Sequence, residues 1–231
     1  MKNKFNQKLI HLIEYYSLIN ANILVSDKPL RLNKEQNSFK SKDKNLNLKK
    51  LKESIEKIND CKIKPSAKNI VFGDGDVNAK LMIIGEAPGS QEDLLGVPFV
   101  GRAGKLLEKM LLAIKLNRKS VYITNVINYR PPQNRKPTED EIKKYLPYLT
   151  EHIQIVNPKI ILLLGSTALN SVLGSEKVIS KARGKWHKEF VGEKEFWILA
   201  SFHPAFLMRQ PDQKKFAWID LKMVREKLKL N

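Results

Sequence analysis

The amino-acid sequence predicts an α/β protein, a three-layer α/β/α sandwich with a central four-stranded parallel sheet. Four short apolar runs, the expected strands, occupy residues 81–84, 121–124, 160–164 and 197–201. Between them lie segments whose apolar residues recur every three or four positions, and this alternation is typical of βαβ units. Right-handed crossovers place helices on both faces of a parallel sheet, which gives the three layers.

The helices expected between these strands cover residues 106–114, 142–153 and 168–172. Each carries apolar side chains at helical spacing. Thr138 and Glu141 form a capping-box pattern, in which each side chain bonds the backbone N–H of the other residue, and this predicts where the second helix begins. With this topology, all four parallel strands end at one edge of the sheet.

Three parts are expected along the chain. Residues 26–47 are polar, rich in Lys and Asn and without periodicity, which predicts a flexible linker. Residues 48–231 are expected to form the globular domain, which opens on a helix carrying Leu48, Leu51 and Ile55. Residues 1–25 predict an amphipathic helix. Its apolar residues are Leu9, Leu12, Ile13, Tyr16 and Ile19.

Composition limits the class of protein. Lys and Arg outnumber Asp and Glu by 42 to 24, and the net charge of +18 favours a polyanionic partner such as nucleic acid. The charge also fits an ordinary solvated surface, so it supports this class without deciding it. A single cysteine, Cys61, excludes an internal disulfide and a metal site made of thiolates alone. Without a membrane span or secretion signal, we expect a cytoplasmic protein with no membrane partner.

Residues that can bind a ligand follow the ends of the strands. Gly85 and Glu86 follow the first, Asn125 the second, Gly165 the third and His203 the fourth. In an open α/β sheet, ligands collect beyond the carboxyl ends of parallel strands, where glycines let the backbone approach a bound group. Taken singly, an asparagine or a histidine in such a place is usually structural. Their joint occurrence at one edge predicts a binding site.

Three long motifs, in this order along the chain, resemble the uracil-DNA glycosylases of the iron-sulfur type, called family 4. The resemblance covers about residues 60–228 and implies an enzyme that removes uracil from DNA and so starts base excision repair. The motifs are Gly-Glu-Ala-Pro-Gly at 85–89 with the run at 92–104, Thr-Asn-Val at 124–126 with the run at 130–135, and His-Pro-Ala-Phe-Leu-Met-Arg at 203–209.

The resemblance assigns roles in the pocket that fit the chemistry of each side chain. Phe99 is the stacking platform for a uracil flipped out of DNA. Asn125 reads the base, because its amide offers a donor to O4 and an acceptor to N3–H, whereas cytosine presents the inverse pattern. His203 donates a hydrogen bond to O2 as negative charge develops on the departing base. The other side of the pocket is formed by Gly85, Glu86 and Ala87.

Water is the nucleophile that the resemblance implies, with no covalent enzyme intermediate. The residue that positions this water is left open by the sequence. Glu86 or Glu92 is expected to orient the water or to balance positive charge on the sugar. The alternative for both carboxylates is capping of the following helix.

The resemblance also implies a DNA-binding surface. Arg135 and Arg209 are expected to contact phosphates. Leu207, with Met208 beside it, is expected to fill the space that the flipped nucleotide leaves in the duplex. Ordinary core packing is the alternative for Leu207 and Met208.

Family 4 members hold a four-iron cluster with four cysteines, and here the chain departs from the family. Cys61 is the lone remnant, and Ile58, Tyr129 and Tyr145 stand at the other three positions. A four-iron cluster needs more thiolates than this chain possesses, so we expect no metal site and no cofactor. Hydrophobic and aromatic packing by the two tyrosines is expected to brace the loops instead.

The leading hypothesis is a monofunctional uracil-DNA glycosylase that acts on uracil-containing DNA as a monomer, with no obligate protein partner. The alternative is a basic, non-catalytic DNA-binding relative that keeps only the fold. Retention of Phe99, Asn125 and His203 together favours the enzyme. Nucleotide binding is disfavoured because neither G-x-G-x-x-G nor G-x-x-x-x-G-K-[ST] occurs in the sequence.

Overall fold

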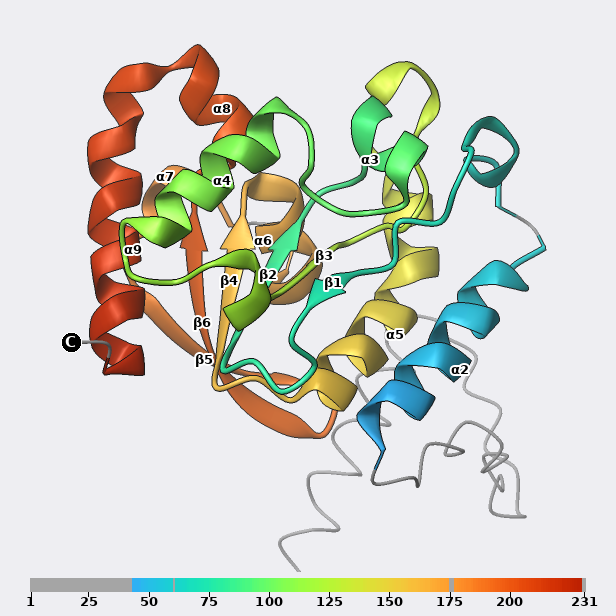
Figure 1. Ribbon diagram of the computed structural model, residues 1–231, viewed down its shortest axis with the longest axis horizontal. Coiled ribbons are helices and arrows are strands. Elements are labelled where there is room, and N and C mark those ends of the chain that lie inside the picture. Colours follow the sequence, from blue (N-terminus) through green and yellow to red (C-terminus); the bar gives the residue numbers. More distant parts are fainter. Residues whose placement is uncertain (1–42, 60, 175–176, 230–231) are drawn as a thin grey trace, which may run out of the picture. The chain divides into compact units, whose positions relative to one another are not determined.

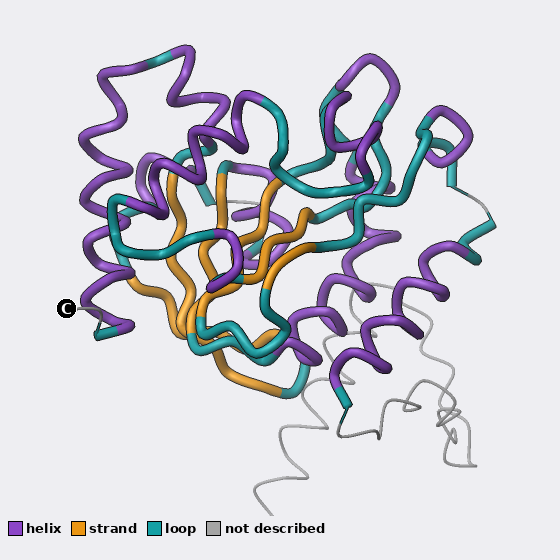
Figure 2. The backbone as a smooth tube through the Cα atoms, in the orientation of Figure 1, coloured by secondary structure: helices purple, strands orange, loops and turns teal. Residues whose placement is uncertain are grey.

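A six-stranded mixed sheet lies at the centre of the residues that the computed structural model describes, 43–59, 61–174 and 177–229 (Figures 1 and 2). The helix expected at 1–25 and residues 26–42 of the expected linker lie outside these ranges. The strand order is β1-β3-β2-β4-β6-β5. The bounds are β1 Asp74–Gly75, β2 Leu81–Gly85, β3 Tyr122–Asn125, β4 Ile160–Leu164, β5 Trp186–Val191 and β6 Lys194–Ser201.

The four central strands β3, β2, β4 and β6 are parallel, which confirms the predicted parallel sheet. Two antiparallel strands that the sequence did not predict extend it, because β1 pairs with β3 at one edge and β5 with β6 at the other. β1 has only two residues, and β5 has three consecutive exposed residues at 188–190. Neither strand carries the apolar run by which the central strands are found.

Helices cover both faces of the sheet (Figure 1). Within the described ranges, no helix is long and apolar enough to cross a membrane. The α-helices are α2 Lys44–Glu56, α3 Ser90–Leu95, α4 Arg102–Leu112, α5 Glu139–Val156, α6 Ser166–Leu173, α7 Ile179–Ala182, α8 Pro204–Arg209 and α9 Lys214–Leu228. Short 3₁₀ helices occupy Lys64–Ser66, Arg118–Ser120, Pro132–Asn134 and Pro211–Gln213.

Alternate residues of β2 face different helical layers. Met82 and Ile84 belong to the core that contains buried residues of α2, α5 and α6. Leu81 and Ile83 belong to the core that contains buried residues of α4 and α9. Since side chains alternate along a strand, β2 is buried on both sides, and the predicted three-layer α/β/α sandwich is confirmed.

Helix α2 begins earlier than expected. Residues 44–47 belong to this helix, which corrects the end of the linker expected at 26–47. The Asp43 side chain caps the helix, because Oδ1 accepts hydrogen bonds from the N–H groups of Asn45 at 2.9 Å and Leu46 at 3.4 Å. The polar composition of this segment hid a helix start that depends on tertiary packing of Leu48 and Leu51.

Helix α5 begins where the capping box predicts. The Thr138 N–H donates to Glu141 Oε2 at 2.8 Å, and the Glu141 N–H donates to Thr138 Oγ1 at 3.2 Å. This exchange satisfies two backbone donors at the start of the helix.

A buried ion pair fixes the end of β6 against α9. Asp220 on α9 is fully buried and accepts a hydrogen bond from Arg183 Nε at 3.0 Å. Its Oδ2 also accepts a hydrogen bond from Ser201 Oγ at 2.6 Å. Ser201 is the last residue of β6, so this network holds the strand two residues before His203.

Replacing Arg183 with Met should lower the free energy of unfolding by about 3–5 kcal/mol, because it leaves the Asp220 carboxylate buried without its partner. Urea unfolding measures the change. Lys188→Met is the matched control, since Lys188 and Glu195 form an ion pair with side chains 52% and 37% exposed. Such a pair is worth no more than about 1 kcal/mol. Equal losses of unfolding free energy in the two variants would contradict the assignment of Arg183 and Asp220 as a stabilising buried ion pair.

Candidate active site

The ends of β2 and β3 lie side by side and carry residues expected to bind a base. Gly85, the last residue of β2, pairs in the sheet register with Asn125, the last residue of β3. Beyond them, the N–H of Val126 donates to the Gly85 carbonyl at 3.0 Å, and the N–H of Ile127 to the Glu86 carbonyl at 3.3 Å. The glycine-rich loop is therefore held along the segment that follows Asn125.

Phe99 and His203 complete this corner from other parts of the chain. A Cβ atom added to Gly85 would lie 2.5 Å from Asn125 Oδ1 and 2.5 Å from Phe99 Cζ, so only glycine leaves room for both side chains. The ring centroids of Phe99 and His203 are 5.5 Å apart, with 33° between the ring planes. The structure thus brings together four of the six residues for which the sequence predicts a shared pocket: Gly85, Phe99, Asn125 and His203.

The backbone of Phe99 is unusual and is held from two sides. Its φ of 54° lies in the left-handed region, which a bulky side chain rarely adopts. Glu92 Oε1 accepts hydrogen bonds from the N–H groups of the next two residues, at 2.9 and 2.7 Å. The Arg118 guanidinium donates to the carbonyl of Phe99 and to that of the preceding residue. No motif pointed to Arg118, and its contacts became visible only with the fold.

Of the two roles that the sequence leaves open for Glu92, the structure supports capping. Gly101 is the N-cap of α4, and Glu92 Oε1 bonds the N–H of this residue and of the one before it. A carboxylate at a helix N-terminus is stabilised by the unpaired N–H groups and by the helix dipole. Glu92 therefore has a structural role in the loop that carries Phe99, and its expected catalytic role stays a prediction.

His203 is the N-cap of α8, and its ring is fixed by the helix that it starts. Nδ1 accepts a hydrogen bond from the N–H of Ala205 at 3.1 Å, so the proton of the neutral ring is on Nε2. Burial lowers the pKa of the His203 imidazole to about 4; nearby Arg209 lowers it further and Glu92 opposes the shift. At neutral pH, His203 offers an uncharged Nε2–H donor.

Glu86 is oriented by a residue that the sequence did not single out. Thr167 Oγ1, in the first turn of α6, donates a hydrogen bond to Glu86 Oε2. This contact joins the loop after β2 to the start of α6. Ala87, the next residue, packs against the core beneath α2 and α5 and brings no side-chain polar group to the site.

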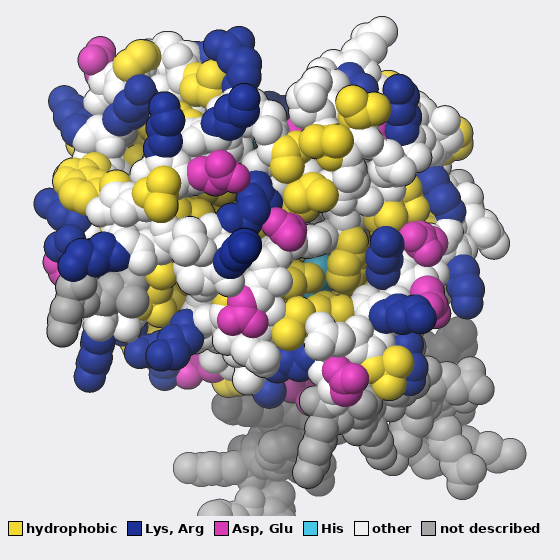
Figure 3. Space-filling model, in the orientation of Figure 1, with side chains coloured by type: hydrophobic (Ala, Val, Ile, Leu, Met, Phe, Trp, Pro, Cys, Tyr) yellow, Lys and Arg dark blue, Asp and Glu magenta, His cyan; other side chains and the backbone are white. Residues whose placement is uncertain are grey.

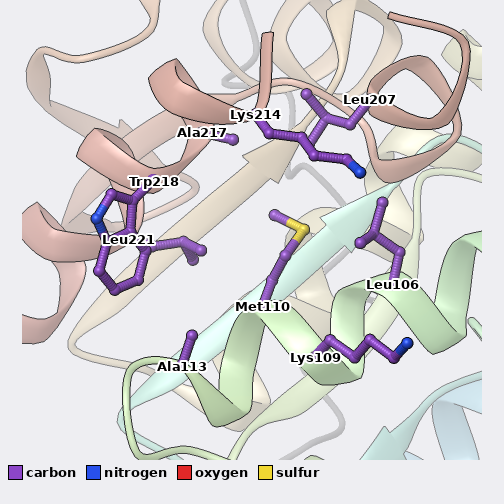
Figure 4. A pocket seen from close by; sticks show the side chains of 9 residues that line it. All are labelled: Leu106, Lys109, Met110, Ala113, Leu207, Lys214, Ala217, Trp218 and Leu221. Atoms are coloured by element: carbon purple, nitrogen blue, oxygen red, sulfur yellow. The ribbon is translucent and has the colours of Figure 1, made fainter. Parts of the chain in front are cut away.

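Helix α8 carries three residues expected to contact DNA, and they differ in exposure. Leu207 is 1% exposed and packs against Phe202 and Ala217 in a core cluster. It also lines a cavity of about 190 Å³ between α4, α8 and α9 (Figure 4). This burial favours core packing, the alternative that the sequence left open, and the entry of Leu207 into DNA stays a prediction. Met208 is partly buried and Arg209 is exposed.

Arg135 contacts a carboxylate of the protein where the sequence predicts a contact to phosphate. Its guanidinium makes a bidentate pair with Glu141, with distances of 2.8 and 2.6 Å. The hydrogen bond to Arg135 is the largest cause that lowers the pKa of Glu141. Lys and Arg side chains nevertheless cover much of the face shown in Figure 3, notably over α4 and α9.

The family model of the uracil DNA glycosylase superfamily matches residues 72–222. The chain belongs to this superfamily. The matched region contains all strands of the sheet and the corner around Gly85. Membership therefore confirms the resemblance seen in the three motifs.

Several curated relatives of this chain carry the name type-4 uracil-DNA glycosylase. That of Sulfurisphaera tokodaii is 42% identical over 184 residues, which are 78% of this chain and 84% of the relative. That of Saccharolobus solfataricus is 38% identical over 187 residues, 79% of this chain and 87% of the relative. That of Thermotoga maritima is 39% identical over 158 residues, 68% of this chain and 81% of the relative.

The residues at the expected cluster positions of this superfamily member form a packed core. Ile58, Cys61, Tyr129 and Tyr145 all belong to one hydrophobic cluster. Cys61 Sγ lies 3.1 Å from Tyr145 Oη, and burial is the largest cause that raises the pKa of Tyr129 to about 12. In the described ranges, no group of three or more His, Cys, Asp and Glu residues could hold a metal ion. This donor set does not fit a cluster bound by four cysteines.

The rate of base removal should not fall on acidification until the pH approaches about 4, where the His203 ring becomes protonated. Because the pKa is lowered from its ordinary value, the neutral ring persists on acidification, and protonation of Nδ1 at lower pH breaks the bond from Ala205. Single-turnover rates across the acidic range, with ¹⁵N spectra of the imidazole, measure this. An inflection near the ordinary value of about 6.5 that follows titration of His203 would contradict it.

Proposed function

We propose that this chain is a monofunctional uracil-DNA glycosylase, which hydrolyses the N-glycosidic bond of a deoxyuridine flipped out of DNA and so starts base excision repair. The observation that carries the proposal is the corner at which an aromatic ring, an amide and an imidazole meet around Gly85. Superfamily membership supports the same reaction. Each of the three side chains supplies something that a flipped uracil needs.

Phe99 replaces the stacking that a base loses when it leaves the duplex. An aromatic platform contributes about 1–3 kcal/mol per stacked base. The ring is 5% exposed and lies against Gly85, so it forms a firm apolar wall of the pocket.

Asn125 selects uracil. Its amide N–H₂ donates to O4 and its Oδ1 accepts from N3–H, while cytosine would place a donor against a donor and an acceptor against an acceptor. The side chain is 3% exposed, so a mismatched pair has no water to compensate it. Because Asn125 is buried, the different hydrogen-bond patterns of uracil and cytosine lead to different rates of base removal.

His203 stabilises the leaving group. Its Nε2–H donates to O2, and the bond strengthens as the departing uracil gains negative charge. A neutral donor forms a stronger hydrogen bond to the base as negative charge develops than to the uncharged base. This difference lowers the activation free energy of base removal.

Water attacks the sugar once the bond to the base has weakened, with no covalent intermediate on the enzyme. With Glu92 committed to the Phe99 loop, Glu86 is the carboxylate that we assign to orient the water and to balance positive charge on the sugar. The hydrogen bond from Thr167 supports this, because it fixes one oxygen and leaves the other for the water.

DNA is bound mainly by α8 and by the Lys and Arg side chains of the surface. Arg209, exposed at the end of α8, contacts a phosphate, and Met208 beside it enters the gap in the duplex. Leu207 supports them from the core. Arg135 can bind a phosphate only after it leaves its carboxylate partner Glu141, so we assign it a smaller contribution to DNA binding. No obligate protein partner is proposed, and the active unit is a monomer.

We also propose that the enzyme works without an iron-sulfur cluster. Its one cysteine cannot replace four thiolates, and Tyr129 and Tyr145 fill the corresponding region with aromatic packing. No step assigned above needs such a group. The non-catalytic alternative is disfavoured because decay of activity would not spare the three pocket side chains together.

His203→Ala should slow uracil excision from a labelled oligonucleotide by on the order of 10²–10³-fold, because it removes one preorganised donor to the developing anion. Single-turnover assays with alkaline cleavage of the abasic product measure the rate. His187→Ala is the matched control, since His187 lies on β5 and bonds the Ala182 carbonyl at 3.2 Å. A folded wild type that binds DNA and never excises uracil would instead favour the non-catalytic relative.

Tyr145→Ala should lower the free energy of unfolding by about 3–5 kcal/mol, since it empties the packed region around Cys61. Tyr145→Phe keeps the ring, loses the contact with Cys61 Sγ and should cost about 1 kcal/mol. Wild-type excision in the presence of a chelator should be unchanged. Iron bound in stoichiometric amount, or activity lost with chelator, would contradict a cluster-free enzyme.

A further inference from the structure

Arg118 makes an unusual set of contacts for a residue outside every motif. It starts the 3₁₀ helix that precedes β3. Its Nη1 donates to the carbonyl of Pro98 at 3.0 Å and to Asp74 Oδ2 at 2.7 Å, and its Nε donates to Glu108 Oε1 at 3.0 Å. Its Nη2 donates to the carbonyl of Phe99. One guanidinium thus donates four hydrogen bonds, two of them to the backbone carbonyls of Pro98 and Phe99.

The two carboxylates fix the guanidinium, and the guanidinium fixes the loop. Asp74 lies on β1 and Glu108 on α4, so the head group of Arg118 is anchored to the sheet edge and to a helix at once. Its side chain is 20% exposed. The planar fork of arginine presents donors in fixed directions, which suits two successive carbonyls, whereas a lysine ammonium has no such geometry.

The carbonyl of Phe99 has little freedom to move away from Arg118. A Cβ atom added to Gly104 would lie 1.8 Å from this oxygen, so the first turn of α4 lies directly against it. Glu92 holds the following two N–H groups. A left-handed phenylalanine persists only where its surroundings determine it, and these contacts do so.

We propose that Arg118 is a positioning residue for uracil recognition. It holds the carbonyls of Pro98 and Phe99 and so sets the plane of the ring on which the base stacks. This inference rests on the proposed function. It deepens that function because it assigns a part in uracil recognition to a residue that does not contact DNA. Arg118 should therefore act on catalysis only through the Phe99 ring.

A double-mutant cycle tests this dependence. The four proteins are the wild type, R118Q, F99L and the double variant, compared by single-turnover excision of uracil from DNA. R118Q should lower the rate by about 10- to 100-fold, as expected for a misplaced contact group. In the F99L background, the same change should alter the rate by less than about threefold, because the two residues act as one unit. Equal factors in both backgrounds, or an unchanged rate in R118Q, would overturn the proposal.

Two controls separate positioning from general stability. Asp74→Asn removes the charge of one anchor but keeps a side-chain oxygen that can accept the bond from Arg118 Nη1, and Glu108 and both carbonyl bonds remain, so its excision rate should stay within about threefold of the wild type. Affinity for the same DNA without uracil should change by less than about twofold in R118Q, because contacts to phosphates dominate that binding. A parallel loss in DNA affinity would assign Arg118 to the DNA surface and overturn the proposal.

Backbone chemical shifts of Phe99 provide a readout that needs no turnover. In R118Q the residue should leave the left-handed region, while Asp74→Asn keeps it there. If Phe99 keeps its backbone conformation in R118Q, Arg118 does not position it, whatever the activity. If R118Q does not fold, R118K carries the whole cycle, with one carbonyl bond lost. A wild type without glycosylase activity would contradict the proposed function, and the shifts would still decide the role of Arg118.

Discussion

The left-handed backbone of Phe99 is the constraint on which the proposed pocket depends. Such a conformation costs about 1–3 kcal/mol and persists only where other contacts exceed that cost. Here a carboxylate from Glu92 binds the two following N–H groups, and a guanidinium from Arg118 binds two carbonyls. Gly85 then admits the ring against Asn125, where a larger residue would collide with both. The strain is therefore stored where a flat wall for a base is needed.

Burial at this corner also decides the charge state of the site. Removing His203 from water holds its pKa near 4, so the ring is neutral where a cation would otherwise stand beside Arg209. The Ala205 N–H occupies Nδ1 and leaves Nε2 to donate. A neutral donor in a poorly solvated pocket interacts weakly with an uncharged base and strongly with an anion. In the proposed mechanism, this electrostatic preference for the leaving group exists before any substrate binds.

The sequence predicts the parts of this protein that obey local rules. The four parallel strands, the capping box at Thr138 and the convergence of strand ends follow from periodicity, capping chemistry and topology. Arg118 and Thr167 could not be found this way, because their partners lie 19 and 81 positions away along the chain. The exposure of a residue on a short helix is equally non-local: Leu207 is buried because Phe202 and Ala217, from other elements, pack with it.

The tyrosines at the expected cluster positions lie apart from the chemistry. Cys61, Tyr129 and Tyr145 belong to the core that packs α2 and α5 against one face of the sheet. Phe99 belongs to the core on the opposite face, with α4 and α9. A change of packing around Tyr145 is therefore separated from the Phe99 loop by the central strands. Asn125 is the link that remains, because Tyr129 follows it by four residues, so a weakened brace would disturb base reading before it disturbed stacking.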